Sequence, residues 1–167
     1  RLLGDATANV LNFTGISLLG SNLSIHGGDG NDTITGSAGA DRILSGKGDD
    51  TLNGAAGSDT YEVAGSVAAG TFEGYDAITD SGTTTGDSDR LVAAAGTAAV
   101  DIGLRSFATS NGIEIIDATA TTGAVRLLGD ATANVLNFTG ISLLGSNLSI
   151  HGGDGNDTIT GSAGADR

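Results

Sequence analysis

The chain has 167 residues, 29 of them glycine, and its 20 acidic against 7 basic side chains give a net charge of −13. Because it has no cysteine, it forms neither disulfides nor a thiolate metal site, and its apolar runs are far shorter than the ~18–20 residues of a membrane span. The negative charge also argues against nucleic acid and anionic membranes as partners, since both attract clustered Lys and Arg.

The apolar content is low for a compact domain. Hydrophobic residues make up 38% of the chain, below the roughly 45–50% of typical globular domains, so a large central core is not expected. Regularly recurring aliphatic residues nevertheless argue against disorder. The chain begins at Arg1 without Met or a leader-like segment, which indicates an internal piece of a longer protein.

The longest internal repeat is identical over its whole length. Residues 1–42 recur without a change at residues 126–167. We therefore expect one complete unit at 1–125 and the start of the next identical unit at 126–167, taken from a tandem array in which each unit contacts its neighbours. Long surface proteins that need reach are commonly built in this way, whereas enzymes rarely repeat undiverged catalytic domains.

A shorter period lies inside the unit, where residues 27–62 divide into four nonapeptides without a gap. They read GGDGNDTIT, GSAGADRIL, SGKGDDTLN and GAAGSDTYE. Each has glycine at the fourth place, aspartate at the sixth and a large residue at the eighth. The aspartates are Asp32, Asp41, Asp50 and Asp59, and the large residues are Ile34, Ile43, Leu52 and Tyr61.

These nonapeptides resemble the calcium-binding repeats of the RTX (repeats-in-toxin) family, whose pattern is G-G-x-G-x-D-x-U-x. The resemblance implies an all-β fold, a right-handed parallel β-roll or β-helix solenoid. In it, six residues turn around Ca²⁺ and the next three form a short strand. Weaker echoes at 74–79 and 87–92 place Asp76 and Asp89 in the same relation to a following aliphatic residue. In the segment 4–12, Asn9 replaces the aspartate, which weakens or removes a site there.

The spacing gives a physical reason for calcium. Two nonapeptides make one coil, so every second turn stacks on the same side. Asp32 then lies beside Asp50, and Asp41 beside Asp59. Neighbouring strands are about 4.8 Å apart, so these carboxylates repel unless a cation lies between them, and Ca²⁺ prefers such oxygen ligands. We predict at least two Ca²⁺ ions, with Asp76 and Asp89 extending the two rows.

The resemblance also implies main-chain ligands. The first site would be completed by the carbonyl groups of Gly27, Asp29, Gly46 and Gly48. The second site would be completed by those of Gly36, Ala38, Ala55 and Gly57. Glycine suits these turns because it reaches backbone angles that aim successive carbonyl groups inward.

Residues 63–125 carry short strand-like groups such as LVAAAG, AAVDIGL and GIEIIDA. We expect degenerate further coils with longer loops, the alternative being a small separate β-sandwich. Phe72, Tyr75 and Phe107 are expected to cap or widen the core. The acids outside the turn pattern, Asp101, Glu114 and Asp117, are expected to be solvated residues at strand edges.

The aspartates of the second copy and the two histidines are weaker candidates for a functional site. Asp157 and Asp166 lack the following turns that Asp50 and Asp59 supply in the first copy, so we expect them to bind metal poorly. His26 and His151 are one position in two copies. Neither has a second His or Cys nearby in the sequence, so no catalytic or zinc role is expected.

The function predicted is that of a calcium-stabilised structural repeat in a large secreted bacterial surface protein of the adhesin or biofilm type, and not an enzyme. The resemblance implies type I secretion, with the chain unfolded in the low-calcium cytosol and folded outside the cell. The expected partners are neighbouring repeat units of the same chain. Two alternatives are the C-terminal RTX module of a secreted enzyme or toxin, and a carbohydrate-active β-helix using acids such as Asp101. The sequence does not name an adhesive target.

Overall fold

The computed structural model describes residues 1–19, 23–82 and 86–164. In that part of the chain nearly all regular structure is β-strand, and the one helix is the single 3-10 turn η1 (Thr109–Asn111), so no helix there is long and apolar enough to cross a membrane. The strands are β1 (Leu2–Leu3), β2 (Val10–Asn12), β3 (Ile25–Asp29), β4 (Thr33–Thr35), β5 (Arg42–Lys47), β6 (Thr51–Asn53), β7 (Thr60–Val63), β8 (Tyr75–Ile78), β9 (Arg90–Ala93), β10 (Val100–Leu104), β11 (Ile115–Asp117), β12 (Val125–Leu128), β13 (Val135–Asn137), β14 (Ser142–Leu144), β15 (Leu148–His151) and β16 (Thr158–Thr160).

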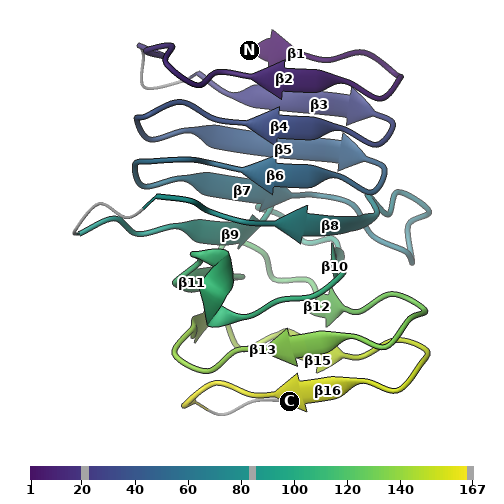
Figure 1. Cartoon of the computed structure of the whole chain (residues 1–167). Coiled ribbons are helices and arrows are strands. Elements are labelled where there is room, and N and C mark those ends of the chain that lie inside the picture. The colour runs from purple at the N-terminus through teal and green to yellow at the C-terminus, as the bar shows by residue number, and fades with distance from the viewer. Residues whose placement is uncertain (20–22, 83–85, 165–167) are drawn as a thin grey trace.

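The strands form a stack of parallel coils. One seven-stranded sheet has the order β1-β3-β5-β7-β9-β11-β14, a second has the order β15-β12-β10-β8-β6-β4-β2, and β13 pairs with β16. Over the first half of the chain, successive strands alternate between the two sheets, so the chain winds as a flat solenoid with its termini at opposite ends (Figure 1). The predicted all-β parallel roll is confirmed.

Coils are shortest in the strict nonapeptides. Ile25 pairs with Ile43 and Ile34 with Leu52, so each partner lies two nonapeptides further along the chain, as predicted. The next coils are longer, because Leu52 pairs with Ile78 and Tyr61 with Leu91. β8 to β12 all join these parallel ladders, which is the arrangement expected of further coils with longer loops over residues 63–125.

The strands on one side of the roll, β3, β5 and β7, are longer than the predicted three residues. β4 and β6 have the expected length, but β3 and β5 run on into the glycine turns, where Gly28 pairs with Gly46 and Asp29 with Lys47. The three-residue expectation is therefore wrong on this side of the roll. Gly28 and Gly46 have φ of 114° and 95°, which lets the ladder continue through the bend.

The core is a thin column of inward side chains. The eighth-place residues Ile34, Ile43, Leu52 and Tyr61 are all buried, and the column continues through residues such as Ile78, Leu91 and Ile116. Burying each such side chain contributes about 1.5–3 kcal/mol.

The three aromatic residues expected to widen the core behave differently. Phe107 is buried and stacks on Phe138 of the second copy, with ring centroids 5.4 Å apart. Phe72 and Tyr75 are half-exposed, and they meet edge to face outside the buried core.

Candidate metal centre

Three aspartates form a row on one side of the roll. The main-chain N–H of Asp32 donates to Oδ1 of Asp50 at 2.7 Å, and the N–H of Asp50 donates to Oδ1 of Asp76 at 3.0 Å. Asn9 stands at the head of the row, since its N–H donates to Oδ1 of Asp32 at 2.8 Å. The predicted stacking of Asp32 on Asp50, with Asp76 next in line, is thus the observed geometry.

A second row lies on the other side of the roll. The N–H of Asp41 donates to Oδ1 of Asp59 at 2.7 Å, and the N–H of Asp59 donates to Oδ1 of Asp89 at 2.7 Å. The N–H of Asp89 donates in turn to Oε2 of Glu114 at 2.8 Å. Glu114 is exposed as expected, yet it ends an acidic row and is not an isolated surface charge.

All six aspartates in these rows are buried, and three of them have a carboxylate oxygen without a hydrogen-bond partner in the described part of the chain. Within the described residues, Oδ2 of Asp32, Asp50 and Asp59 has no hydrogen-bond partner. A buried carboxylate oxygen without a partner is costly. A hard cation would satisfy these oxygens, so the donor set fits Ca²⁺.

The electrostatics of the rows favour a cation. Burial raises the pKa of Asp50 to about 6, and that of Asp76 to about 7. In the second row, burial raises the pKa of Asp59 to about 8 and that of Asp89 to about 6. In each case the main-chain N–H partly opposes the shift, while neighbouring carboxylates increase it. Without a cation, ionising both rows at neutral pH therefore opposes folding.

The first place of each turn lies against the aspartate of the same turn. A Cβ added to Gly27 would lie 2.2 Å from Oδ2 of Asp32, and one added to Gly36 would lie 2.7 Å from Oδ2 of Asp41. The sixth place of a turn thus folds back onto its first place, and a side chain at the first place would fill the space beside the carboxylate. The side chain of Asp29 is exposed.

The other residues whose carbonyl groups are predicted to bind Ca²⁺ lie on the neighbouring turns. Gly46, Gly48 and Gly57 have positive φ, of 95°, 132° and 112°. Ala55 has φ of 81° and is the one non-glycine residue in the described ranges with a positive value. Ala38 is exposed on the turn that stacks on that of Ala55. Glycine adopts these left-handed conformations without steric cost, which is why it recurs in these turns.

Sequence reasoning missed Asp80. One carboxylate oxygen each from Asp59, Asp80 and Asp89 lie within 4.8 Å of one another, and all three residues are buried. Asp80 comes shortly after β8, immediately beyond the echo at 74–79. Counting on from that echo places Asp80 at the first position of the next turn, which is the signal that could have identified it.

The expectation for Asp101 is wrong. Its side chain is fully buried, and Arg126 donates to both of its oxygens, with Nε at 2.6 Å from Oδ1 and Nη2 at 2.7 Å from Oδ2. Burial by itself would raise the pKa of Asp101, but the hydrogen bonds and charge of Arg126 hold it below its ordinary value. Asp117 is half-buried and pairs with Arg90 at 3.1 Å. The error arose because the partner arginine of each acid lies on a neighbouring coil. The coils in this part of the chain differ in length, so the spacing of residues does not predict the pairing.

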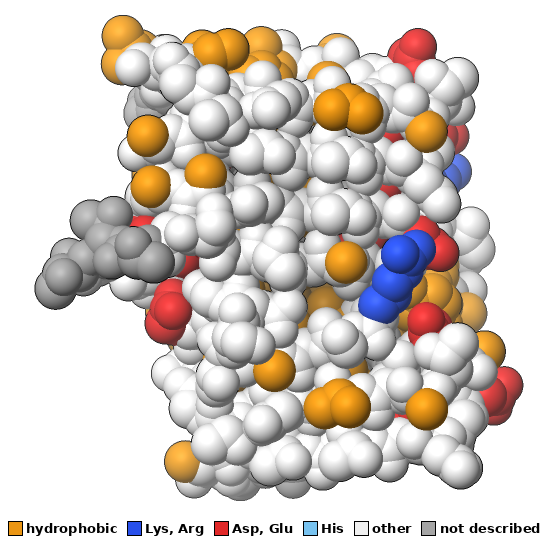
Figure 2. Space-filling model, viewed as in Figure 1, with side chains coloured by type: hydrophobic (Ala, Val, Ile, Leu, Met, Phe, Trp, Pro, Cys, Tyr) orange, Lys and Arg blue, Asp and Glu red, His pale blue; other side chains and the backbone are white. Residues whose placement is uncertain are grey.

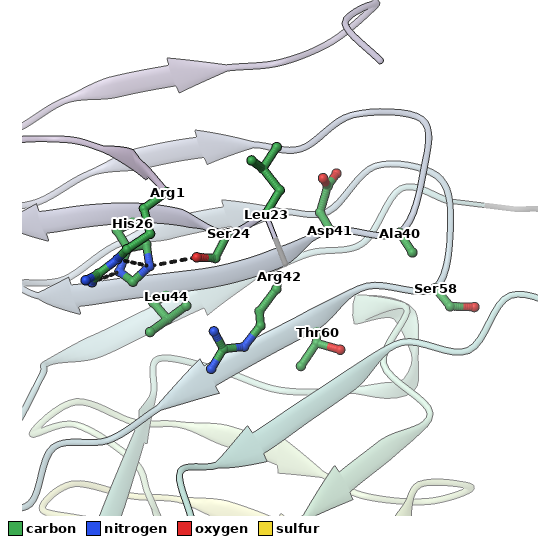
Figure 3. Close-up of a pocket in the computed structure, with 10 residues that line it drawn as sticks. All are labelled: Arg1, Leu23, Ser24, His26, Ala40, Asp41, Arg42, Leu44, Ser58 and Thr60. Atoms are coloured by element: carbon green, nitrogen blue, oxygen red, sulfur yellow. Dashed lines mark hydrogen bonds between the residues drawn. The ribbon is translucent and has the colours of Figure 1, made fainter. Parts of the chain in front are cut away.

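A hollow lies on the outer surface of β3, β5 and β7 (Figure 3). Asp41 is the one carboxylate among its lining residues, and its Oδ2 accepts the N–H of Ser37 at 2.6 Å. A glycosidase needs two facing acids. His26 contacts Ser24 at 2.9 Å and Arg1 at 3.1 Å, so its surroundings are those of a surface hydrogen-bond network.

The second copy reproduces the head of the first row. Oδ1 of Asp157 accepts the N–H of Asn134 at 3.0 Å, as Asp32 does for Asn9. Asp157 is half-buried, whereas Asp32 is buried under the next coil. Asp166 lies outside the described residues.

Comparison with known proteins agrees with this geometry. Residues 26–61 and 149–167 match the family model of the RTX calcium-binding nonapeptide repeat, in four copies. These two segments of the chain are therefore RTX repeats, which bind Ca²⁺. No curated protein and no solved structure matches the chain.

Proposed function

We propose that this chain, with its RTX repeats, is a structural unit of a secreted bacterial surface protein of the adhesin type, and that it folds when it binds Ca²⁺ outside the cell. The observation that carries the proposal is the pair of buried aspartate rows, in which three Oδ2 atoms of the described residues lack a hydrogen-bond donor. Calcium supplies the missing positive charge without a basic side chain.

The ions lie between stacked turns. Asp32 and Asp50 hold the first ion with the carbonyl groups of Gly27, Asp29, Gly46 and Gly48. Asp41 and Asp59 hold the second with those of Gly36, Ala38, Ala55 and Gly57. Asp76 and Asp89 extend the rows and bind further ions. The hydrogen bonds that link consecutive aspartates support this assignment, because they set the carboxylates of neighbouring turns side by side.

The electrostatics of the buried acids support the proposed export route. In a low-calcium cytosol, the raised pKa values of the buried acids mean that folding requires either protonation or a cation, so the chain stays unfolded. Extracellular calcium modules have dissociation constants of about 10⁻⁴–10⁻³ M, which suits folding after type I secretion.

The structural role rests on the unchanged recurrence of residues 1–42 at 126–167. Neighbouring units of the same chain are the partners proposed, and adhesive contacts reside in other parts of the protein. A secretion and folding module of an enzyme or toxin is the rival role. The gene distinguishes them, since a long array of identical units supports the first and a single catalytic domain upstream supports the second.

Calcium titration tests the proposal directly. Circular dichroism should change from a largely unfolded spectrum in EDTA to a β-rich one as Ca²⁺ is added, while Mg²⁺, which demands a tighter octahedral shell, should not substitute. Equilibrium dialysis should find at least two bound ions. An equally folded chain in excess EDTA would overturn the proposal that metal is integral to the fold.

A further inference from the structure

Asp80 continues a column whose two preceding members, in the strict nonapeptides, are glycines. Since Leu52 pairs with Ile78, the residue opposite Gly54 is Asp80 on the next coil. Gly54 lies in turn opposite Gly36, because Thr35 pairs with Asn53. The first place of three stacked turns is thus glycine, glycine and aspartate, and only the third turn adds a carboxylate at the place that faces the aspartate row.

The side chain of Asp80 is held in position. Tyr61 Oη donates to its Oδ2 at 2.9 Å, and the N–H of Gly82 donates to its Oδ1 at 2.7 Å. Asp59 lies across from it, is 1% exposed, and has an Oδ2 with no hydrogen-bond partner among the described residues. That oxygen lies against Gly54, the residue opposite Asp80, since a Cβ added to Gly54 would be 2.1 Å from it.

The surroundings of this cluster add negative charge. Asp87 accepts the N–H of Gly57, and Glu114 accepts the N–H of Asp89. The ion pairs found among the described residues join Arg42 to Glu62, Arg90 to Asp117, Arg105 to Asp49 and Arg126 to Asp101. None of them involves the three clustered acids, so the charge they require comes from outside the protein.

We infer that Asp59, Asp80 and Asp89 bind one Ca²⁺ through three carboxylates, and that this ion is the one the chain binds most tightly. The inference rests on the proposed function but differs from the repeat pattern, in which a turn contributes a single aspartate side chain. Affinity of calcium sites rises with the number of charged ligands, so the long coils after Thr60 hold the strongest site although their sequence departs furthest from the strict motif.

The test replaces the charge and keeps the shape. Asp80→Asn keeps the shape and one oxygen, which can accept from Tyr61 or from the N–H of Gly82 but not from both. Asp154→Asn makes the same change at an exposed aspartate of the second copy, away from the cluster. Titration calorimetry should show the tightest calcium class weakened by about tenfold or more in Asp80→Asn and unchanged in Asp154→Asn. If both variants match the wild-type chain, the inference is overturned while the proposed function stands. If the wild-type chain binds no calcium, the proposed function itself fails.

A second readout does not depend on Asp80→Asn folding well. The chain has two tyrosines and no tryptophan, so Tb³⁺ emission excited through tyrosine reports on Tyr61 and Tyr75 alone. The first equivalent of Tb³⁺ should give emission that Tyr61→Phe abolishes and Tyr75→Phe retains. Emission at the first equivalent that survives Tyr61→Phe would place the tightest site elsewhere and overturn the inference.

A different observation supports a second inference, which concerns the apolar edge formed by residues 1–19. The identical residues 126–144 lie within the chain's stack, so the same sequence is seen in two environments. Ile16 is 49% exposed and its counterpart Ile141 is 6% exposed. Leu19 is 88% exposed and Leu144 is 38% exposed. Figure 2 shows hydrophobic side chains gathered along the end of the molecule where Figure 1 places the N-terminus.

The structure shows which elements pack against the second copy. β10 pairs with β12, β11 pairs with β14, and Phe107 stacks on Phe138. In the first copy the counterpart of β14, residues 17–19, forms no strand. Residues 1–19 therefore lack the neighbouring strands that pack against the identical residues 126–144.

We infer that the apolar edge binds residues 100–117 of another copy of the unit, in the arrangement that the chain itself shows for 126–144. Phe13 then stacks on that copy's Phe107, and Arg1 pairs with its Asp101 as Arg126 does here. The result is one uninterrupted solenoid across the junction of two units.

The test extends the chain by placing residues 63–125 before Arg1, which is the order in which they precede Arg126. Hydrogen exchange should then protect the amides of Ser17–Leu19 to the level of Ser142–Leu144. Leu11→Ala should then lower the melting temperature as much as Leu136→Ala does, whereas without the added residues it should lower it much less. Unchanged exchange at Ser17–Leu19 would overturn the inference, and this readout is independent of the calcium assignments.

Discussion

Arg126 holds the buried carboxylate of Asp101 with two hydrogen bonds, whereas its counterpart in the first copy, Arg1, contacts His26. One arginine in two identical sequences thus has two roles, and the difference arises from what the neighbouring coil places beside it. The pair Asp101 and Arg126 also fastens the second copy to the first through adjacent strands β10 and β12.

The first prediction uses this matched pair of arginines. Arg126→Met leaves the fully buried Asp101 without its cation and should lower the free energy of unfolding by about 3–5 kcal/mol. Arg1→Met removes an exposed residue and should change it by no more than about 0.5 kcal/mol. Urea unfolding in saturating calcium measures both. Equal effects would mean that the ion pair between Asp101 and Arg126 does not stabilise the fold.

The second prediction separates side-chain ligands from carbonyl ligands. Asp50→Asn removes one of the two charges from the proposed first site and should raise the calcium midpoint of folding severalfold. Asp29→Asn changes an exposed side chain whose carbonyl group stays in place, so the midpoint should stay the same. Circular dichroism during calcium titration measures the midpoint. A shift of equal size in both variants would contradict the assignment.

The third prediction concerns pH in the absence of calcium. Burial raises the folded-state pKa of four aspartates to between about 6 and about 8, namely Asp50, Asp59, Asp76 and Asp89. The folded chain therefore binds more protons than the unfolded chain from about pH 4 upward, so its stability is present at low pH and is lost as the pH rises to about 8.

Thermal melts without calcium should accordingly show a more stable chain at pH 5 than at pH 8. With saturating calcium the order should reverse, because Ca²⁺ binds the ionised carboxylates and competes with protons. A calcium-free chain that is more stable at pH 8 would show that the buried acids are ionised without a counter-charge.

The fourth prediction concerns the glycine column. Gly48 has φ of 132° and an added Cβ would lie 2.1 Å from the carbonyl oxygen of Gly30, so Gly48→Ala should destabilise the calcium-bound chain by about 1–3 kcal/mol. Gly39 holds the same place in its nonapeptide but has no positive φ, and the atom nearest to an added Cβ would be Oγ of Ser37 at 3.9 Å.

Gly39→Ala should therefore be neutral or stabilise the chain by up to about 1 kcal/mol, since alanine restricts the unfolded state. Thermal unfolding of the two variants in saturating calcium makes the comparison. A loss of stability in Gly39→Ala as large as in Gly48→Ala would mean that all four fourth-place glycines are needed for conformation.

The sequence predicted the site wherever its period was constant. Asp32, Asp50, Asp41 and Asp59 could be paired because a fixed step of two nonapeptides decides which turns stack. Asp80 and the pair of Asp101 with Arg126 could not, because the longer and unequal steps beyond Thr60 depend on how each loop packs. Spacing also says nothing of burial, which is why Asp101 was expected in solvent.

The direction of the ladders has a mechanical consequence. Strands lie across the long axis, and the termini lie at opposite ends of the stack (Figure 1). A pull between the two ends of the stack acts along the inter-strand hydrogen bonds. Neighbouring coils therefore bear the force in series and separate one after another, instead of all strand pairs shearing at once. An ion bound between two turns links two neighbouring coils. Tension on the array would then be resisted most in the calcium-bound coils, and the coils without aspartate rows would be the first to extend.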